Sequence, residues 1–243
     1  MKSEAPFKIF NSLNGQKEEF NPCNSDHIKI YACGPTVYNY AHIGNARMAV
    51  VFDTFVRTLR IFYPKVTYVS NITDIDDKII EAAHEQKVEI SSITEKYTKI
   101  YNDDMSKLNV LMPDIQPKAT EYIPEMIELI EDLISKDFAY VKEDHVLFHV
   151  PNYVNYGKLS KRNRDEQIAG SRVEVAPFKK DPADFVLWKP SDKSQPGWDS
   201  PWGVGRPGWH TECSAMSKKT LGLPFDIHGG GRDLIFPHHE NEI

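Results

Sequence analysis

The sequence is poor in the features that mark several classes of protein. It contains only three cysteines in 243 residues, Cys23, Cys33 and Cys213, and these widely separated thiols cannot all pair. They argue against a disulfide scaffold and fit a reducing, cytoplasmic setting. No stretch approaches the roughly 18 uncharged apolar residues of a transmembrane helix, so we expect no membrane partner. The beginning of the chain lacks the apolar run of a signal peptide, and we expect no targeting segment.

An excess of positive charge is also absent. Lysine and arginine total 29 against 35 aspartates and glutamates, which gives a net charge of −6 and argues against a small basic nucleic-acid-binding module. Hydrophobic residues make up 40% of the chain and charged residues 26%, which argues against disorder and predicts a globular protein with a sizeable core.

What the chain does contain is an alternation of strand and helix patterns. Asn14-Gly15 predicts a tight hairpin turn. Residues 27–33 have the pattern of a strand, apolar residues between 48 and 59 recur at helical spacing, and 65–71 have the pattern of a second strand. This order predicts a parallel sheet in a doubly wound α/β domain. Further helices are expected at 74–86, 91–108, 122–134, 208–221 and from about 237, and further strands at 146–150 and 225–228. The basic stretch 156–180 shows little periodicity and is expected to be loop-rich and exposed.

The first candidate site is the tetrapeptide His42-Ile43-Gly44-Asn45, between the first of these strands and its helix. A helix N-terminus offers unpaired backbone N–H groups and a partial positive charge, which suit a phosphate. Gly44 would let a nucleotide approach the backbone, and His42 and Asn45 could donate to phosphate oxygens. A plain helix cap explains the same residues, but ligands of open α/β sheets bind at this end of the strands.

The second candidate is a metal site. His238 and Glu242 are four residues apart on an expected helix and share a face, Cys213 lies on the preceding helix, and Cys33 ends the first strand. Two thiolates, an imidazole and a carboxylate match a tetrahedral zinc shell. Spacing leaves alternatives open, because a buried cysteine commonly behaves as a small apolar residue and His239 could replace His238.

A third candidate is the run Gly229-Gly230-Gly231-Arg232-Asp233, which follows an expected strand. Glycines allow close approach of a purine or a ribose, and Asp233 could accept hydrogen bonds from ribose hydroxyls. A flexible turn explains this run equally well.

Together these motifs carry a family resemblance. The chain resembles the N-terminal catalytic part of cysteinyl-tRNA synthetases, which are class I aminoacyl-tRNA synthetases, in the ordered segments KIFNSLNGQKEEF, YACGPTVYNYAHIGNAR, NITDIDDKII, DFVLWK, GRPGWHTECSAM and FDIHGGGRDLIFPHHENE. The resemblance implies an α/β fold, with a Rossmann-like parallel sheet and an inserted α+β subdomain. Residues 1–117 would form the first part of the catalytic domain with an N-terminal hairpin, 118–203 the connective subdomain, and 204–243 the second, truncated part of the catalytic domain.

The resemblance also implies roles for single residues. ATP binding falls on His42, Gly44, Asn45, His228, Gly231 and Asp233, where Asn45 replaces the second histidine of the general H-I-G-H signature. One zinc ion per chain falls on Cys33, Cys213, His238 and Glu242, which favours His238 over His239. Cysteine binding falls on Thr73 and Trp209, for which a polar strand end and a packed core indole are the structural alternatives.

The implied reaction is the ATP-dependent activation of cysteine to cysteinyl-adenylate, with Mg²⁺ on ATP, followed by transfer to the 3′ adenosine of tRNA. The carboxylate of cysteine attacks the α-phosphate, so no side chain is expected to act as a nucleophile, general acid or general base. Packing separates cysteine from serine only about 10²-fold, whereas zinc binds a thiolate far better than an alcohol. We therefore expect zinc to bind the substrate sulfur.

The family's second signature, K-M-S-K-S, and its anticodon-binding region do not occur in these 243 residues. We expect a fragment of a longer protein that binds zinc but activates cysteine weakly or not at all on its own. Two other functions are compatible with the residues: a related ligase that joins activated cysteine to an amino sugar, and a non-catalytic, zinc-stabilised binding domain.

Overall fold

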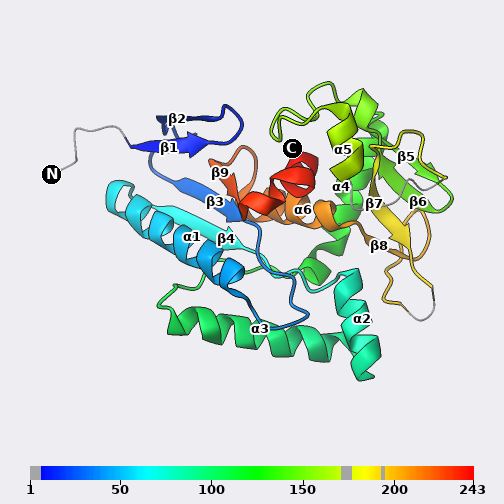
Figure 1. Cartoon of the computed structure of the whole chain (residues 1–243), viewed down its shortest axis with the longest axis horizontal. Helices are drawn as coiled ribbons and strands as arrows, with labels where there is room; N and C mark the ends of the chain where they lie inside the picture. Colours follow the sequence, from blue (N-terminus) through cyan, green and yellow to red (C-terminus); the bar gives the residue numbers. More distant parts are fainter. Residues whose placement is uncertain (1–6, 171–176, 193–194) are drawn as a thin grey trace. The chain divides into compact units, whose positions relative to one another are not determined.

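The computed structural model describes residues 7–170, 177–192 and 195–243 (Figure 1). The chain divides into two compact units: unit 1 comprises Met1–Phe10, Lys17–Glu121 and Met216–Gly231, and unit 2 comprises Asn11–Gln16, Tyr122–Ala215 and Arg232–Ile243. None of the helices in the described ranges has the length and apolar character needed to span a bilayer.

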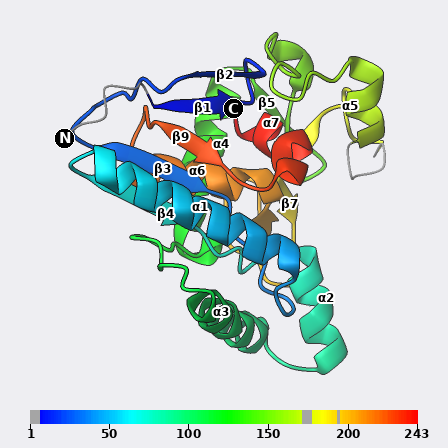
Figure 2. The same cartoon turned by 60° about the vertical axis from the view of Figure 1, so that its left-hand side comes forward.

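The centre of unit 1 is a parallel sheet with the strand order β4–β3–β9. Strand β3 (Ile28–Ala32) pairs in parallel with β4 (Val66–Ser70) on one side and β9 (Ile227–Gly229) on the other. Helix α1 (Ile43–Phe62) connects β3 to β4 and runs alongside these two strands in Figures 1 and 2. The expected strand–helix–strand unit and its parallel α/β sheet are therefore confirmed.

Two apolar clusters hold unit 1 together. One joins the sheet to α1 and includes Ile28, Ile30 and Leu59, which are fully buried. The other joins α2 (Asp77–Gln86) and α3 (Ile90–Lys107) to the loop that follows β3, through Val37. This loop is thus fixed by the core on which it lies.

The N-terminal hairpin has its turn at the expected position. Strands β1 (Lys8–Asn11) and β2 (Gln16–Glu19) pair with each other. Gly15 has a φ of +69°, a conformation that glycine adopts without a steric penalty.

The centre of unit 2 is an antiparallel sheet with the order β5–β6–β7–β8. Its strands are β5 (Ala139–Lys142), β6 (His145–Phe148), β7 (Phe185–Pro190) and β8 (Gly205–Pro207). Helix α4 (Ile123–Ser135) packs against β5.

The remaining elements are the 3₁₀ turns η1 (Ala119–Tyr122), η2 (Val150–Asn152) and η3 (Arg232–Leu234), the π-helical turn η4 (Ile235–His239), and the helices α5 (Arg164–Gly170), α6 (Trp209–Leu221) and α7 (Glu240–Glu242).

The loop-rich stretch expected over 156–180 contains a helix, α5, that the sequence did not predict. Helix α5 interrupts the stretch, and the side chain of Gln167 on it is buried and donates to the carbonyl oxygen of Arg162 at 2.9 Å. Residues 171–176 of the stretch lie outside the described residues.

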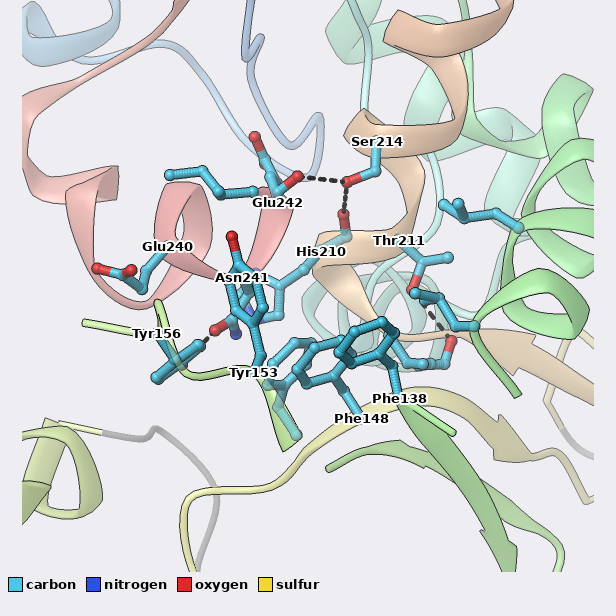
Figure 3. Close-up of a pocket in the computed structure, with 15 residues that line it drawn as sticks. Phe138, Phe148, Tyr153, Tyr156, His210, Thr211, Ser214, Glu240, Asn241 and Glu242 are labelled. Atoms are coloured by element: carbon cyan, nitrogen blue, oxygen red, sulfur yellow. Dashed lines mark hydrogen bonds between the residues drawn. The ribbon is translucent and has the colours of Figure 1, made fainter. Parts of the chain in front are cut away.

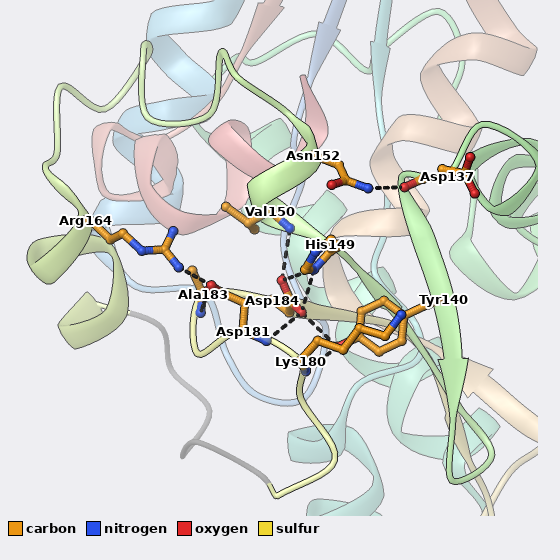
Figure 4. Close-up of polar contacts among 10 residues, drawn as sticks. All are labelled: Asp137, Tyr140, His149, Val150, Asn152, Arg164, Lys180, Asp181, Ala183 and Asp184. Carbon is orange, nitrogen blue, oxygen red and sulfur yellow. Dashed lines mark hydrogen bonds and ion pairs between the residues drawn. The ribbon is translucent and has the colours of Figure 1, made fainter.

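A buried carboxylate directly before β7 binds residues of β5 and of the segment 149–150 (Figure 4). Asp184, which is fully buried, accepts hydrogen bonds from the Tyr140 hydroxyl at 2.7 Å and from the Val150 backbone N–H at 3.0 Å, and it pairs with His149 at 3.2 Å. Burial, together with the hydrogen bond and charge of Asp184, raises the pKa of Tyr140 to about 12, so the phenol stays a donor. Asp184 therefore joins residues from three segments of unit 2.

Candidate functional site

The loop between β3 and α1 ends in a capped helix N-terminus. His42 is the N-cap residue: its Nδ1 accepts from the Gly44 N–H at 3.0 Å, while the side-chain oxygen of Asn45 accepts from the His42 N–H at 3.1 Å. This reciprocal pair is a capping box, which satisfies two of the N–H groups that a helix start leaves open. His42 and Gly44 are exposed and Asn45 is half-buried, so solvent reaches the first turn.

The loop before α1 leaves the carboxyl end of β3, and at this strand the order of the sheet reverses. The connection through α1 leads from β3 to β4 on one side, and β9 flanks β3 on the other. The Cys33 N–H donates to the carbonyl oxygen of Gly229 at 2.9 Å, so the carboxyl ends of β3 and β9 are adjacent. Open α/β sheets bind their ligands at this kind of position.

The residues at the end of β9 have different surroundings. His228 is exposed, its ring stacks on Tyr31, and its Nε2 lies 3.5 Å from Cys33 Sγ. A Cβ on Gly229 would lie 2.4 Å from the Phe52 ring, so the close packing of α1 accounts for this glycine. Gly231 is the last residue of unit 1, whereas Asp233 is exposed in η3 of unit 2.

Thr73 is buried just beyond β4. Its N–H donates to the carbonyl oxygen of Pro35 at 3.0 Å, and its hydroxyl oxygen accepts from the Asn71 side chain at 3.2 Å. The Asn71 side chain in turn accepts from the Gly34 N–H at 2.9 Å. Thr73 and Asn71 thus join the loop after β3 to the end of β4.

Unit 2 brings together three of the four predicted metal ligands. One ligand atom from each of Cys213 on α6, His238 on η4 and Glu242 on α7 lies within 4.8 Å of the other two. Cys213 and His238 are each 2% exposed, and the Glu242 side chain is 3% exposed. The distance from His238 Nε2 to Glu242 Oε1 is 2.5 Å, as expected for residues four apart on one face.

The electrostatics of this cluster favour a cation. Burial alone would lower the pKa of His238, but the charge and hydrogen bonds of Glu242 and Cys213 outweigh burial and raise the pKa to about 10. The carboxyl group of Glu242 and the sulfur of Cys213 thus favour positive charge at the position of His238. Sulfur, nitrogen and carboxylate oxygen are the ligand atoms of structural and catalytic zinc sites, so these three residues fit a zinc ion.

Two further residues belong to the predicted metal set: Cys33 as the fourth ligand and His239 as the alternative to His238. Cys33 is buried in unit 1, directly after β3. His239 is also buried and has a ligand atom within 4.8 Å of one from Glu242. Within unit 2, however, it is His238 that groups with Cys213. The choice of His238 over His239 stays a prediction.

Two neighbouring aromatic residues of α6 lie against His238. The ring of Trp209 stacks on the imidazole, with centroids 4.4 Å apart and planes 18° apart. His210 Nδ1 lies 2.9 Å from His238 Nδ1, so the imidazole nitrogen that faces away from Glu242 is also engaged. His210 was not predicted as a site residue, although it lies three residues before Cys213, and residues at this spacing share a helix face.

A cavity of about 200 Å³ opens beside this cluster in unit 2 (Figure 3). Aromatic side chains, among them Phe138, Phe148 and Tyr153, line one part of it, and His210, Ser214 and Glu242 line another. An apolar cavity with a few polar groups is typical of a small-molecule site.

Comparison with known proteins identifies the family. The family model "tRNA synthetases class I (C) catalytic domain" matches residues 19–243. The chain is 64% identical to the cysteine–tRNA ligase of Parvibaculum lavamentivorans, over 97% of the chain and 50% of that protein, and 60% identical to that of Rhodospirillum rubrum, over 97% and 51%. It therefore spans about half the length of these curated relatives.

Solved structures agree on the fold. Methionyl-tRNA synthetase of Mycobacterium tuberculosis, in complex with methionyl-adenylate, has a TM-score of 0.65 at 12% identity, over 86% of this chain and 52% of that one. This likeness supports the Rossmann-like α/β architecture predicted from the sequence. The chain belongs to the family of class I (C) tRNA synthetase catalytic domains.

Proposed function

We propose that this chain is the catalytic part of a cysteine–tRNA ligase, which activates cysteine with ATP and transfers it to tRNA. The observation that carries the proposal is the buried cluster of Cys213, His238 and Glu242 in a chain so similar to curated cysteine–tRNA ligases. The two alternatives, an amino-sugar ligase and a non-catalytic zinc domain, are not favoured, because these relatives are named as ligases of cysteine and tRNA.

In this proposal the start of α1 binds ATP, with Mg²⁺ on its phosphates. His42 and Asn45 donate to phosphate oxygens, Gly44 lets the phosphates approach, and the helix dipole favours their negative charge. His228, Gly231 and Asp233 contact the nucleoside. Activation needs no side-chain nucleophile, because these groups orient ATP so that the carboxylate of cysteine can attack the α-phosphate.

Selection of cysteine falls to the metal cluster and its neighbours. Cys33 joins Cys213, His238 and Glu242 as the fourth protein ligand of one zinc ion. Zinc, when bound, supplies a Lewis acid that takes a thiolate in preference to an alcohol. Thr73 and Trp209 contact the bound amino acid, and the acceptor end of tRNA is the partner that receives it.

The cellular setting and the domain plan belong to the same proposal. The setting we propose is reducing and cytoplasmic, because three widely separated cysteines do not suit a disulfide scaffold. We retain the division into 1–117, 118–203 and 204–243 as the proposed catalytic and connective parts.

The proposal is tested with cobalt in place of zinc. Cobalt–thiolate absorption reports the number of sulfur ligands, so cysteine added to the cobalt-loaded chain is expected to intensify it, whereas serine is not. Cysteine-dependent ATP–pyrophosphate exchange and tRNA charging by a protein that contains this chain test the reaction itself. A chain that binds no zinc, or whose cobalt spectrum responds equally to serine and cysteine, would contradict the proposal.

A further inference from the structure

The short helix that supplies Glu242 has a second buried carboxylate on another side. Glu240 is 2% exposed and lies two residues before Glu242, which turns the two side chains about 200° apart around a helix axis. Figure 3 shows them pointing in different directions from the same turn. Glu242 belongs to the metal cluster, so Glu240 faces something else.

Glu240 faces the backbone of the loop that follows η2. Its Oε1 accepts from the Gly157 N–H at 2.8 Å and its Oε2 accepts from the Ser160 N–H at 2.7 Å. Among the described residues it makes no ion pair with a lysine or arginine. Both carboxylate oxygens therefore accept hydrogen bonds from one loop. Only a group with two acceptor atoms can bind the N–H groups of Gly157 and Ser160 at once.

Further contacts join this loop to the same turn. The Tyr156 hydroxyl donates to the side-chain oxygen of Asn241, and the guanidinium of Arg162 lies 4.4 Å from the centre of the Phe236 ring. Burial, and then the charge of Glu240, raise the pKa of Tyr156, which keeps its hydroxyl protonated. The loop 156–162 thus contacts the residues on both sides of His238.

The shape of the loop is itself specified. Gly157 has a φ of +91°, and a Cβ there would lie 2.2 Å from Nε2 of Gln167. Glycine is therefore required at the point where Glu240 binds. The loop also carries the exposed basic residues Lys158, Lys161 and Arg162.

We propose that Glu240 is a positioning residue for the metal site, and that it couples the order of the loop 156–162 to metal binding by His238 and Glu242. This inference rests on the proposed function, because it takes these two residues as ligands. The loop holds the turn in the conformation that presents both ligands, and by thermodynamic reciprocity a bound metal stabilises the loop.

The first test compares zinc affinities by competition with a chromophoric chelator. Loss of a partner that orients metal ligands weakens binding about 10- to 100-fold, and we expect E240Q to do so, because its amide group places a donor against a backbone N–H. D165N removes the same charge from an exposed position on α5 and should bind zinc as the unsubstituted chain does. S160P removes one of the two N–H donors to Glu240 and leaves the sequence of η4 and α7 unchanged. It should also weaken zinc binding.

Trypsin provides a readout that does not depend on activity. Zinc should slow cleavage after Lys158, Lys161 and Arg162, while cleavage after the exposed Lys87 of unit 1 should not respond. In E240Q the protection by zinc should be lost.

The outcomes separate the two proposals. If the unsubstituted chain binds no zinc, the proposed function fails and this inference with it. If zinc binds, but E240Q and S160P bind it as tightly as D165N does, or the loop is cleaved at the same rate with and without zinc, only the inference is overturned.

Discussion

The start of α1 in unit 1 and the cluster of Cys213, His238 and Glu242 in unit 2, which is the proposed metal site, differ in how their side chains are exposed. At the start of α1, His42 and Gly44 are exposed, and the side chains assigned to ATP cap the helix. In the metal cluster, Cys213, His238 and the Glu242 side chain are each at most 3% exposed, and they face one another.

The difference predicts how far ligand binding and stability can be separated. An exposed cap contributes modestly to stability, so its residues can be changed with the fold intact. Buried charged ligands cannot be changed with the fold intact, because a charge is costly to bury without a partner. Metal binding by such residues is therefore linked to folding. Mutations in the two places should therefore have different signatures.

The largest effect is expected from Cys213→Ser. Loss of a residue that only supports a metal ligand weakens binding about 10- to 100-fold. Because a hydroxyl is a poor zinc ligand, Cys213→Ser should lower zinc affinity by more than this. Metal content after dialysis measures this, and Cys23→Ser, at an exposed cysteine of unit 1, is the matched control. A chelator should lower the unfolding midpoint of the control and leave that of Cys213→Ser unchanged. Equal zinc content in both variants would contradict the assignment of the cluster.

The next largest effect concerns two glycines, one directly after β3 and one in the first turn of α1. A Cβ on Gly34 would lie 1.7 Å from the backbone oxygen of Asn71, whereas a Cβ on Gly44 meets only the side chain of His42 at 2.7 Å. Gly34→Ala should therefore cost about 3 kcal/mol or more, because backbone must move. Gly44→Ala should cost less than about 1 kcal/mol while weakening ATP binding, because the imidazole can swing away.

Urea unfolding and ATP titration of both glycine variants check this expectation. If Gly44→Ala destabilised the chain as much as Gly34→Ala, the start of α1 would not be the loosely packed end that its exposure indicates.

A smaller effect is expected from Asn45→Ala. The variant loses the hydrogen bond from the His42 N–H, and loss of a cap bond costs about 0.5–2 kcal/mol. It also loses the proposed phosphate donor. In a longer protein that contains this chain, the KM for ATP in pyrophosphate exchange should therefore rise even at temperatures where the variant is fully folded. Asn45→His, which restores the usual signature of the class, should recover ATP binding. A variant with lower stability and an unchanged KM would leave Asn45 as a cap alone.

Local patterns explain why unit 1 could be predicted in more detail than unit 2. The strand, helix and strand of 27–71 each show their own periodicity, and the parallel pairing follows from their order. Strands β5 and β7 are too short to show a periodicity of their own, and α5 lies in a polar stretch in which Gln167 is buried. Strand β5 pairs with β6, and β7 pairs with β6 and β8, so both form in the context of the sheet.

The candidate site shows the same limit at the level of single residues. Spacing pairs His238 with Glu242, but it cannot tell that Glu240, two residues earlier, binds a loop some 80 positions away. Nor does it show that His210 meets His238. Such contacts depend on tertiary structure, which brings distant segments together.

The smallest effect concerns Asp74, a buried carboxylate of unit 1 outside the metal set. It accepts from the backbone N–H and the hydroxyl of Thr120 at 2.9 and 2.6 Å, and burial outweighs these bonds and raises its pKa. A raised pKa means that the folded state binds the proton more tightly, so Asp74 contributes most below its unfolded pKa of about 4, and this contribution is lost as the pH rises through the folded value.

Asp74→Asn keeps both contacts, because the amide can accept from the N–H and donate to the hydroxyl oxygen. We expect it to change the free energy of unfolding by less than about 1 kcal/mol. The variant should gain stability relative to the unsubstituted chain as the pH rises from about 4 to 7. Urea unfolding across this range measures the difference. A loss of stability at every pH would mean that Thr120 requires a carboxylate at this position.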